Sequence, residues 1–358
     1  MGNNNEVDPT ETVTSDEVAT FSCALSRRSM LKGIGGAALL QTLPFPAFTA
    51  DKVKASFAYG SIGYIWSVVH IAQKTNAWKA AGLELETIDF PTGRAAMQAL
   101  LAESADFATA TDTPVVFAAM RGLKPVVLAS YSRYSLDMKV TVRKDRDIDP
   151  NEPASLKGKR IGTTLGTSGQ YMLDRYLEMA GLNMAEIEII NMKPADLVTA
   201  TARGDLDGFS WTSRASRLAD KQSNGMTATM TQDGFEKYFQ SHQLFLTNEK
   251  VVNERPEVLK PAVQALLAAE EYIHKNSDWP QQITERTKTP AEEIRKSVSV
   301  YEFEVRFDQR FLDDLVAEAE WAIRSGLVPS PGGDLKALMR GVIHDGPLRE
   351  LRPDRVTI

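Results

Sequence analysis

Two stretches of the chain, about a hundred residues apart, are built on one plan. In each, a helical pattern ends, a short turn follows, and an acidic residue opens a strand. Asp106 opens the first strand and Asp207 opens the second. Aligning these two residues puts Thr111 opposite Thr212, at the ends of the two strands. The repeat predicts two similar lobes that face one another, each presenting a polar loop from a strand end.

The first of these strands ends in the sequence Ala-Thr-Ala-Thr-Asp-Thr-Pro, residues 108–114. Thr113 stands directly before Pro114, the arrangement in which a hydroxyl caps a helix with proline in its first turn. The first turn of a helix has N–H groups without intrahelical partners and a partial positive charge, so it can hold a small anionic or polar group. The sequence therefore predicts a ligand site where this strand ends.

A second helix start of the same kind follows a strand that ends at Leu165. The sequence Gly166-Thr167-Ser168-Gly169 combines a glycine-bearing turn with hydroxyls that can cap the helix expected over residues 170–180. We therefore expect a second site for an anionic or polar group in the other half of the chain.

Strand and helix patterns alternate along most of the chain. This alternation is typical of an α/β fold with a mostly parallel sheet and helices on both faces, in which ligands bind outside the carboxyl ends of the strands. The loops expected at those ends in the first lobe are residues 60–64, 92–94 and 111–113.

The two lobes are expected to share the chain unequally. A charged run at residues 143–147, with prolines after it, predicts a surface crossing into the second lobe. A strand at residues 242–247 and a helix at residues 256–276 are expected to return to the first lobe. The resulting assignment has two crossing strands, with lobe 1 at residues 51–142 plus 242–358 and lobe 2 at residues 143–241.

The first fifty residues form a leader, which we expect to be disordered apart from an export signal. Arg27 and Arg28 precede an apolar run at residues 33–43, which is typical of a twin-arginine signal and is too short to span a bilayer. Cleavage after Ala50 would put Phe48 where a small residue is preferred, so the junction stays open by a few residues. The alternative is a basic disordered tail before a membrane-surface helix.

The composition excludes several classes of function. Hydrophobic residues make up 43% of the chain and charged residues 25%, as in ordinary globular proteins. The net charge of −6 argues against a nucleic-acid partner. Cys23, the single cysteine, lies in the leader, so we expect neither a disulfide nor thiol chemistry in the exported protein. The histidines and the cysteine show no metal-ligand spacing, and we expect no metal and no cofactor.

Several stretches stand in the order and spacing of one family. They are Gly82-Leu83-Glu84-Leu85-Glu86, residues 98–107, residues 156–162 with Gly166-Thr167, and residues 203–207 with Trp211. Over nearly all of residues 51–358 the sequence resembles the solute-binding proteins of ABC importers for nitrate, sulfonates and taurine, a family that includes thiamine-precursor-like binding proteins. It departs from that family at Gly93-Arg94 and at Trp211-Thr212-Ser213. Both departures touch the expected pocket, so the resemblance indicates the fold and leaves the ligand open.

This resemblance implies a two-lobe periplasmic receptor, with the type II periplasmic-binding-protein fold, that closes on a small molecule and presents it to a membrane permease and its ATPase. We expect a monomer. Hydroxyls and helix-start amides would hold the polar head of the ligand, Arg94 would add charge, and Tyr64 with Trp211 would pack on the organic part. The expected ligand-binding residues are Gly60, Ser61, Tyr64, Thr92, Arg94, Thr111, Asp112, Tyr131, Thr167, Ser168 and Trp211.

Asp112 leaves the charge of the ligand open. A carboxylate beside an anion pocket weakens binding unless it faces a cation, as the ammonium group of a taurine-like zwitterion would provide. The helix starts and Arg94 favour a small sulfonate, carboxylate or related organic anion. Asp106 and Asp207, by contrast, are expected to be structural, because both precede their strands.

Two other classes of function stay open at this stage. Gly166-Thr167-Ser168-Gly169-Gln170 is close to the nucleophile elbow of esterases, which would make Ser168 the nucleophile of a hydrolase. Gln170 replaces the last glycine of that motif, and no histidine lies in a recognisable triad motif. A receptor that reports its ligand to a signalling partner would have the same sequence features as a receptor for import.

Overall fold

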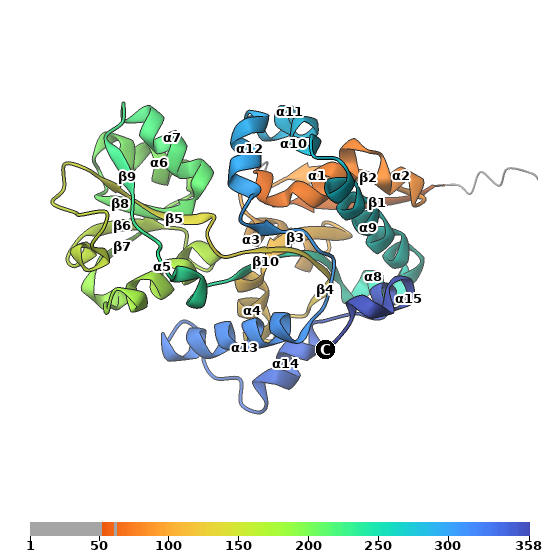
Figure 1. Cartoon of the computed structure of the whole chain (residues 1–358). Coiled ribbons are helices and arrows are strands. Elements are labelled where there is room, and N and C mark those ends of the chain that lie inside the picture. Colours follow the sequence, from red (N-terminus) through yellow and green to blue (C-terminus); the bar gives the residue numbers. More distant parts are fainter. Residues whose placement is uncertain (1–51, 61–62) are drawn as a thin grey trace, which may run out of the picture. The chain divides into compact units, whose positions relative to one another are not determined.

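The computed structural model describes residues 52–60 and 63–358, which belong to one compact unit, Ala50–Ile358. The expected leader, its cleavage site and Ser61 lie outside the described residues. Two β-sheets form the framework of this unit, one with six strands in the order β11-β4-β10-β3-β1-β2 and one with five in the order β7-β6-β8-β5-β9 (Figure 1). The strands are β1 Val53–Tyr59, β2 Leu83–Asp89, β3 Phe107–Thr111, β4 Pro125–Tyr134, β5 Met138–Arg143, β6 Arg160–Thr163, β7 Glu188–Asn191, β8 Gly208–Thr212, β9 Thr227–Thr229, β10 Ser241–Asn248 and β11 Tyr301–Glu302.

Both sheets follow the same pairing pattern, which confirms the repeat found in the sequence. In the six-stranded sheet β1 is parallel to β2 and β3, and β10 runs antiparallel beside β3. In the five-stranded sheet β6 is parallel to β7 and β8, and β5 runs antiparallel beside β8. Each sheet is therefore mixed, whereas the sequence pattern predicts mostly parallel sheets. The antiparallel strand enters each sheet from the other one, which is why it runs against the local strand direction.

One strand lies in a different sheet from the one expected. The sequence assigns residues 138–142 to the first lobe, but β5 pairs with β8 and β9 in the five-stranded sheet. The chain thus crosses between the sheets just after β4, before the charged run that suggested the crossing. It returns between β9 and β10. The other lobe boundaries stay a prediction.

Helices cover the faces of both sheets. Figure 1 shows α1, α2 and α9 on one side of the six-stranded sheet and α4, α13 and α14 on the other. The α-helices are α1 Ser67–Lys74, α2 Ala77–Ala80, α3 Gly93–Leu101, α4 Asp112–Met120, α5 Ser168–Met179, α6 Pro194–Arg203, α7 Ser213–Gln222, α8 Glu249–Glu254, α9 Leu259–Lys275, α10 Trp279–Gln282, α11 Thr284–Thr287, α12 Ala291–Val298, α13 Gln309–Arg324, α14 Leu335–Gly341 and α15 Gly346–Leu351, with a short 3-10 helix η1 Tyr64–Trp66 before α1. Leaving aside residues 1–51, 61 and 62, no helix is long and apolar enough to cross a membrane.

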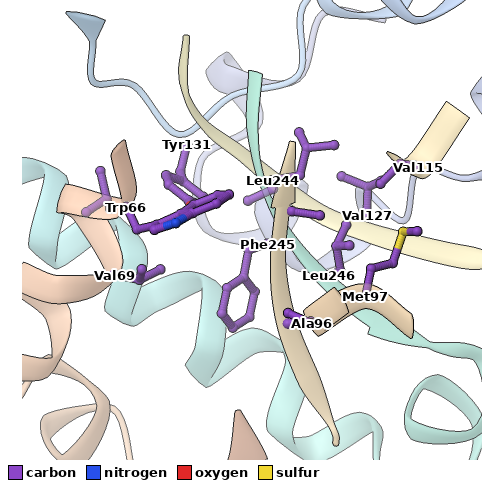
Figure 2. Packing of buried hydrophobic residues seen from close by; sticks show 14 of the residues in the cluster. Trp66, Val69, Ala96, Met97, Val115, Val127, Tyr131, Leu244, Phe245 and Leu246 are labelled. Atoms are coloured by element: carbon purple, nitrogen blue, oxygen red, sulfur yellow. The ribbon is translucent and has the colours of Figure 1, made fainter. Parts of the chain in front are cut away.

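The returning strand β10 lies at the centre of the larger sheet, and all eight of its residues are buried. Phe245 packs against Trp78 of α2, with ring centroids 5.7 Å apart, and against Phe107 of β3 at 5.1 Å. Because side chains alternate along a strand, Leu246 faces the other side, where Figure 2 shows it next to Ala96 and Met97 of α3. Burial on both faces explains why this strand is almost free of charge.

Asp106 and Asp207 hold equivalent pairs of parallel strands together in the two sheets. An oxygen of Asp106 accepts a hydrogen bond from the backbone N of Ser56 at 2.7 Å, and Phe107 stands opposite Phe57. An oxygen of Asp207 accepts one from the backbone N of Arg160 at 2.8 Å, in the equivalent register. Each carboxylate thus accepts from the amide one residue before the point at which the two neighbouring strands begin to pair. The expected structural role of both residues is confirmed.

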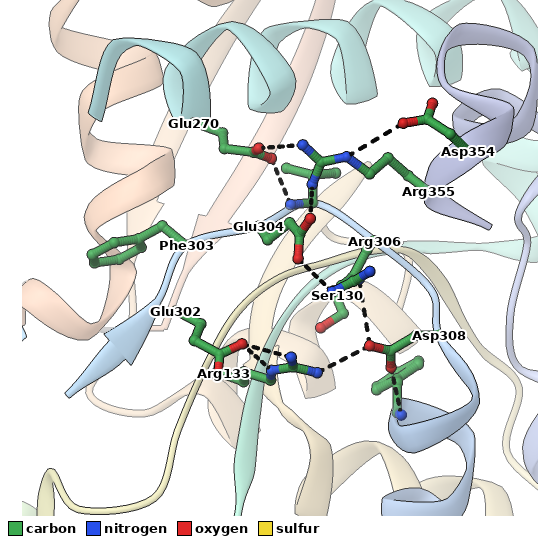
Figure 3. Close-up of polar contacts among 12 residues, drawn as sticks. Ser130, Arg133, Glu270, Glu302, Phe303, Glu304, Arg306, Asp308, Asp354 and Arg355 are labelled. Carbon is green, nitrogen blue, oxygen red and sulfur yellow. Dashed lines mark hydrogen bonds and ion pairs between the residues drawn. The ribbon is translucent and has the colours of Figure 1, made fainter. Parts of the chain in front are cut away.

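Figure 3 shows an alternating row of arginines and carboxylates that fixes an extended segment after β11. Glu302 and Asp308 pair with Arg133 of β4, at 2.5 Å and 3.0 Å. Further along, Glu304 pairs with Arg306 and with Arg355 near the C-terminus. Since several charges share partners in a network, this row is a better anchor than isolated surface pairs would be.

We expect Asp207→Ala to lower the free energy of unfolding by about 1–3 kcal/mol, because the amide of Arg160 would lose its charged acceptor. Asp205→Ala removes an exposed carboxylate from the same turn and should change this free energy by less than about 0.5 kcal/mol. Urea unfolding measures both values. Equal losses in the two variants would contradict the anchoring role.

Candidate functional site

A cavity of about 570 Å³ lies where the strands of both sheets end. Its lining includes Gly60 after β1, Phe90 after β2 and Thr111 at the end of β3. From the second sheet it includes Thr167 after β6 and Trp211 in β8. This is the place at which α/β sheets bind ligands, and its size falls within the roughly 300–1,000 Å³ of small-molecule sites.

Five helices, each of nine to twelve residues, begin at the wall of this cavity. The N-cap side chains of α4, α6 and α7 accept no hydrogen bond from the first turn of their helices. Several peptide dipoles therefore point their positive ends at one space, which favours an anionic group. The five N-cap residues, all in the lining, are Thr92, Thr111, Thr167, Lys193 and Thr212.

Cationic side chains outnumber acidic ones in the lining, where Arg94, Lys193 and Arg214 stand against Asp196. Arg94 donates from Nη1 to the carbonyl of Leu165 at 2.6 Å, and Arg214 donates from Nε to Thr289 Oγ1 at 3.3 Å. The exposed ammonium of Lys193 has no hydrogen bond or ion pair within residues 52–60 and 63–358. The charges of the wall thus add to the effect of the helix starts.

Two glycines set the positions of large side chains in the wall. Gly166 has φ +71°, and a Cβ there would lie 2.5 Å from Nη1 of Arg94. A Cβ at Gly169 would lie 2.6 Å from ring carbons of Trp211. The guanidinium of Arg94 and the indole of Trp211 therefore rest directly on the turn and first helical residues that follow β6.

Direct contacts join the two sides of the cavity. Ser168 Oγ donates to Thr111 Oγ1 at 3.3 Å, so the starts of α4 and α5 touch each other. The bond from Arg94 to Leu165 makes a second link between the sides. Both contacts use residues that the sequence predicts to bind ligand.

The hydroxyl of Tyr64 forms hydrogen bonds with other side chains of the protein. It bonds to Ser213 Oγ at 2.6 Å and accepts a hydrogen bond from Arg217 at 3.2 Å, both on α7. Asp137, in the crossing segment, accepts from the hydroxyl of Tyr301 at 2.9 Å and from Ser213. Tyr64 still lines the cavity, but its hydroxyl ties the first sheet to α7.

Asp112 and Tyr131 do not line the cavity, which does not fit the expectation that they contact a ligand. Asp112 is buried, and its carboxylate accepts from the backbone N of His242 at 2.7 Å and from Ser241 Oγ at 3.0 Å. It therefore holds β10 against the start of α4. Tyr131 is fully buried in the core. Nor is Thr113 the cap of this helix: α4 begins at Asp112, with Thr111 as its N-cap residue.

Of the other expected residues, Ser61 lies outside the described part of the chain and the rest line the cavity. The sequence missed Lys193 and Arg214 as lining residues, although the repeat could have found Lys193. Asp207 follows Asp106 by 101 residues (207 − 106), and the same offset leads from the N-cap residue Thr92 to Lys193 (193 − 92). Trp66, Phe90, Tyr134 and Met138 were also missed, because apolar residues at strand ends read as core.

The hydrolase alternative finds no support in the site. Ser168 contacts Thr111, and no histidine is among the residues that line the cavity. The histidines that make contacts do so elsewhere, for example His70 with the carbonyl of Gly63 and His242 with Asp314. Within the described residues no group of His, Cys, Asp and Glu could hold a metal ion.

Comparisons with known proteins agree with this fold. A family described as NMT1/THI5 like matches residues 67–279, and the chain belongs to this family. The taurine-binding periplasmic protein of Escherichia coli (strain K12) is 25% identical over 247 residues, which cover 68% of this chain and 74% of that protein.

Two solved structures show the fold. The alkanesulfonate-binding protein SsuA of Xanthomonas axonopodis pv. citri, bound to MOPS, has a TM-score of 0.69 and 17% identity over 83% of this chain and all of that one. The nitrate-binding protein NrtA of Synechocystis PCC 6803 has a TM-score of 0.69 and 17% identity over 85% and 89%. The chain has the two-lobe fold of periplasmic binding proteins, with one sheet in each lobe.

A pair of buried carboxyl groups under the start of α4 makes stability depend on pH. Burial raises the pKa of Asp112 to about 6, against the opposing charge of His242. Burial, and then the charge of Asp112, raise the pKa of Glu318 on α13 well above its usual range. The folded state therefore holds protons that the unfolded chain releases. The contribution of these two carboxyl groups to stability is fully present below about pH 4 and is lost as the pH rises through their raised pKa values.

We expect Glu318→Gln to reduce this loss, so that from pH 4.5 to 7.5 the variant loses at least about 1.4 kcal/mol less unfolding free energy than the parent, which corresponds to one pKa unit. Urea unfolding across this pH range measures the difference. Glu320→Gln, on the exposed side of the same helix, should leave the pH dependence unchanged. Parallel curves for the parent and Glu318→Gln would show that the pair does not titrate as described.

Proposed function

We propose that this protein is the solute-binding component of an ABC importer and captures a small organic anion between its two lobes. The observation that carries the proposal is the cavity at which five helices begin, with three cationic side chains and one acidic one in its wall. Fixed dipoles and charges of one sign at a partly enclosed site attract and hold an anion.

The ligands of two similar proteins suggest which kind of anion is bound. The family member from Escherichia coli binds taurine, and the structural neighbour from Xanthomonas binds alkanesulfonates. A sulfonate group spreads its negative charge over three oxygens. Such a group is bound better by several helix starts than by a single cationic side chain. We therefore propose a sulfonate or a similar organic anion as the solute, with binding and release but no chemical step.

Closure of the two lobes would be the signal that the importer reads. A ligand that touches both lobes favours the closed state by its differential contacts. The bonds from Arg94 to Leu165, from Ser168 to Thr111 and from Tyr64 to Ser213 support such a state in this chain. The proposed partners are a membrane permease and its ATPase. The proposed location is the periplasm, reached through the twin-arginine leader.

Titration of the purified full chain with sulfonates and carboxylates tests the proposal. We expect Arg214→Gln to weaken binding of these anions roughly tenfold at low salt, because it removes a charged hydrogen-bond donor worth about 1.5–3 kcal/mol. The loss should shrink as added salt screens the charge. Arg203→Gln, an exposed site at the end of α6, is the matched control. Binding of neutral or cationic solutes only would contradict the proposal.

The contacts of Tyr64 allow closure to be tested separately from ligand contact. We expect Ser213→Ala to weaken anion binding by roughly three- to tenfold, since it removes a hydrogen bond worth about 1 kcal/mol and leaves Tyr64 without one partner. Small-angle scattering should show a smaller ligand-induced compaction. Tyr64→Phe should have the same effect, and the double variant should lose little more, because both act on one network. Additive losses, or an equal loss in Ser104→Ala on the exposed surface, would point to another cause.

A further inference from the structure

We propose that the anion bound in this cavity carries a bulky aromatic body, in preference to a small zwitterion of the taurine type. This inference deepens the proposed function and rests on it. Three features of the cavity support it: the aromatic side chains in its wall, its volume, and the absence of a buried carboxylate among the described residues that line it.

Aromatic side chains come to the cavity from both lobes. Trp66, Phe90 and Tyr134 belong to the first lobe, and Trp211 belongs to the second. Trp66 donates its indole N–H to the carbonyl of Gly60 at 3.1 Å, which fixes the position of its ring at the wall. Trp211 packs directly against Gly169, where a Cβ would lie 2.6 Å from its ring carbons. Rings fixed in this way bind flat apolar groups by stacking and edge contacts.

Tyr134 adds a polar group to this wall. Its side chain is buried and lines the cavity, and its hydroxyl has no hydrogen-bond partner within residues 52–60 and 63–358. A buried hydroxyl without a partner is unfavourable. A polar atom of a bound ligand that reaches this hydroxyl would remove the deficit.

The volume fits a molecule larger than the smallest sulfonates. The cavity measures about 570 Å³, in the middle of the range of roughly 300–1,000 Å³ for sites that enclose drug-sized ligands. A solute of taurine's size would leave much of this space to water, against aromatic walls. A ring system would replace that water and bury apolar surface on both sides.

The charges of the site do not suit an ammonium group. Asp112, which the sequence places beside the ligand, faces β10, with both carboxylate oxygens engaged by His242, Ser241 and Thr113. The acidic residue that does line the cavity, Asp196, is exposed on the first turn of α6. An ammonium group inside the cavity would therefore face Arg94 and Arg214 without a buried counter-charge, which weakens binding.

Two matched comparisons test the inference on the purified full chain by calorimetry. Taurine and ethanesulfonate differ by one ammonium group, and ethanesulfonate is expected to bind at least threefold more tightly. Ethanesulfonate, benzenesulfonate and naphthalene-2-sulfonate share one head group and differ in the apolar body. The naphthalene compound is expected to bind at least tenfold more tightly than ethanesulfonate, a difference of about 1.4 kcal/mol.

Variants locate the effect in the aromatic wall. Trp211→Ala should weaken naphthalene-2-sulfonate at least tenfold and ethanesulfonate no more than threefold. Phe90→Ala, at a half-buried position less important for folding, should show the same selectivity to a smaller degree. Tyr238→Ala removes an exposed aromatic residue outside the cavity and should change neither affinity.

The outcomes separate this inference from the proposed function. Taurine or ethanesulfonate binding as tightly as the aromatic sulfonates would overturn the aromatic body and leave anion capture standing. If no sulfonate or carboxylate of any size binds, the proposed function fails and this inference fails with it. Equal losses of both ligands in Trp211→Ala and in Phe90→Ala would also overturn it, because the rings would then support only the shape of the site.

Discussion

The hydrogen bonds of Asp106 and Asp207 to the neighbouring strands underlie the geometry of the whole site. Each carboxylate takes the amide that precedes the first paired residue of the neighbouring strand, and so sets where β3 and β8 begin and, five residues later, where they end. The helices that follow start at equivalent depths in the two lobes. Because the strand ends of both lobes face one cavity, the positive ends of five helices meet there. These two polar contacts therefore help to fix the positions of two of the five helix starts, those of α4 and α7.

The cavity wall combines aromatic side chains with cationic side chains and helix starts. Aromatic rings exclude water and lower the local dielectric, which strengthens every fixed dipole and charge nearby. In such a place an unmatched negative side chain would be costly, and Asp112 is kept out of it by its bonds to β10. Arg94 spans the gap between the lobes and is held by Gly166, so one charge serves both closure and electrostatics.

Much of the fold and of the cavity could be predicted from the sequence, because the two halves of the chain repeat the same order of strand, loop and helix. Strand and helix order, the equivalence of Thr111 and Thr212, and most of the loop residues at the cavity follow from local patterns and from the two aspartates. The sequence could not predict which sheet contains β5, because its residues fit a strand in either lobe. Only its pairing with β8 shows that it belongs to the five-stranded sheet. The direction of the Asp112 side chain depends on β10, more than a hundred residues away. Aromatic residues such as Trp66 and Tyr134 read as core, and only the folded chain shows that they border a cavity.

The path of the chain through the two sheets also sets an order of assembly. All strands of the smaller sheet lie between Met138 and Thr229, whereas the larger sheet combines β1 to β4 with β10 and β11. As the chain leaves the ribosome, the second lobe has its full set of strands while the first still lacks its central one. Pairing between distant segments is slow to form, so β10, followed by β11, joins the first lobe after the second lobe has all of its strands. The cavity between the lobes can form only after both lobes have folded, so it is the last part of the molecule to form.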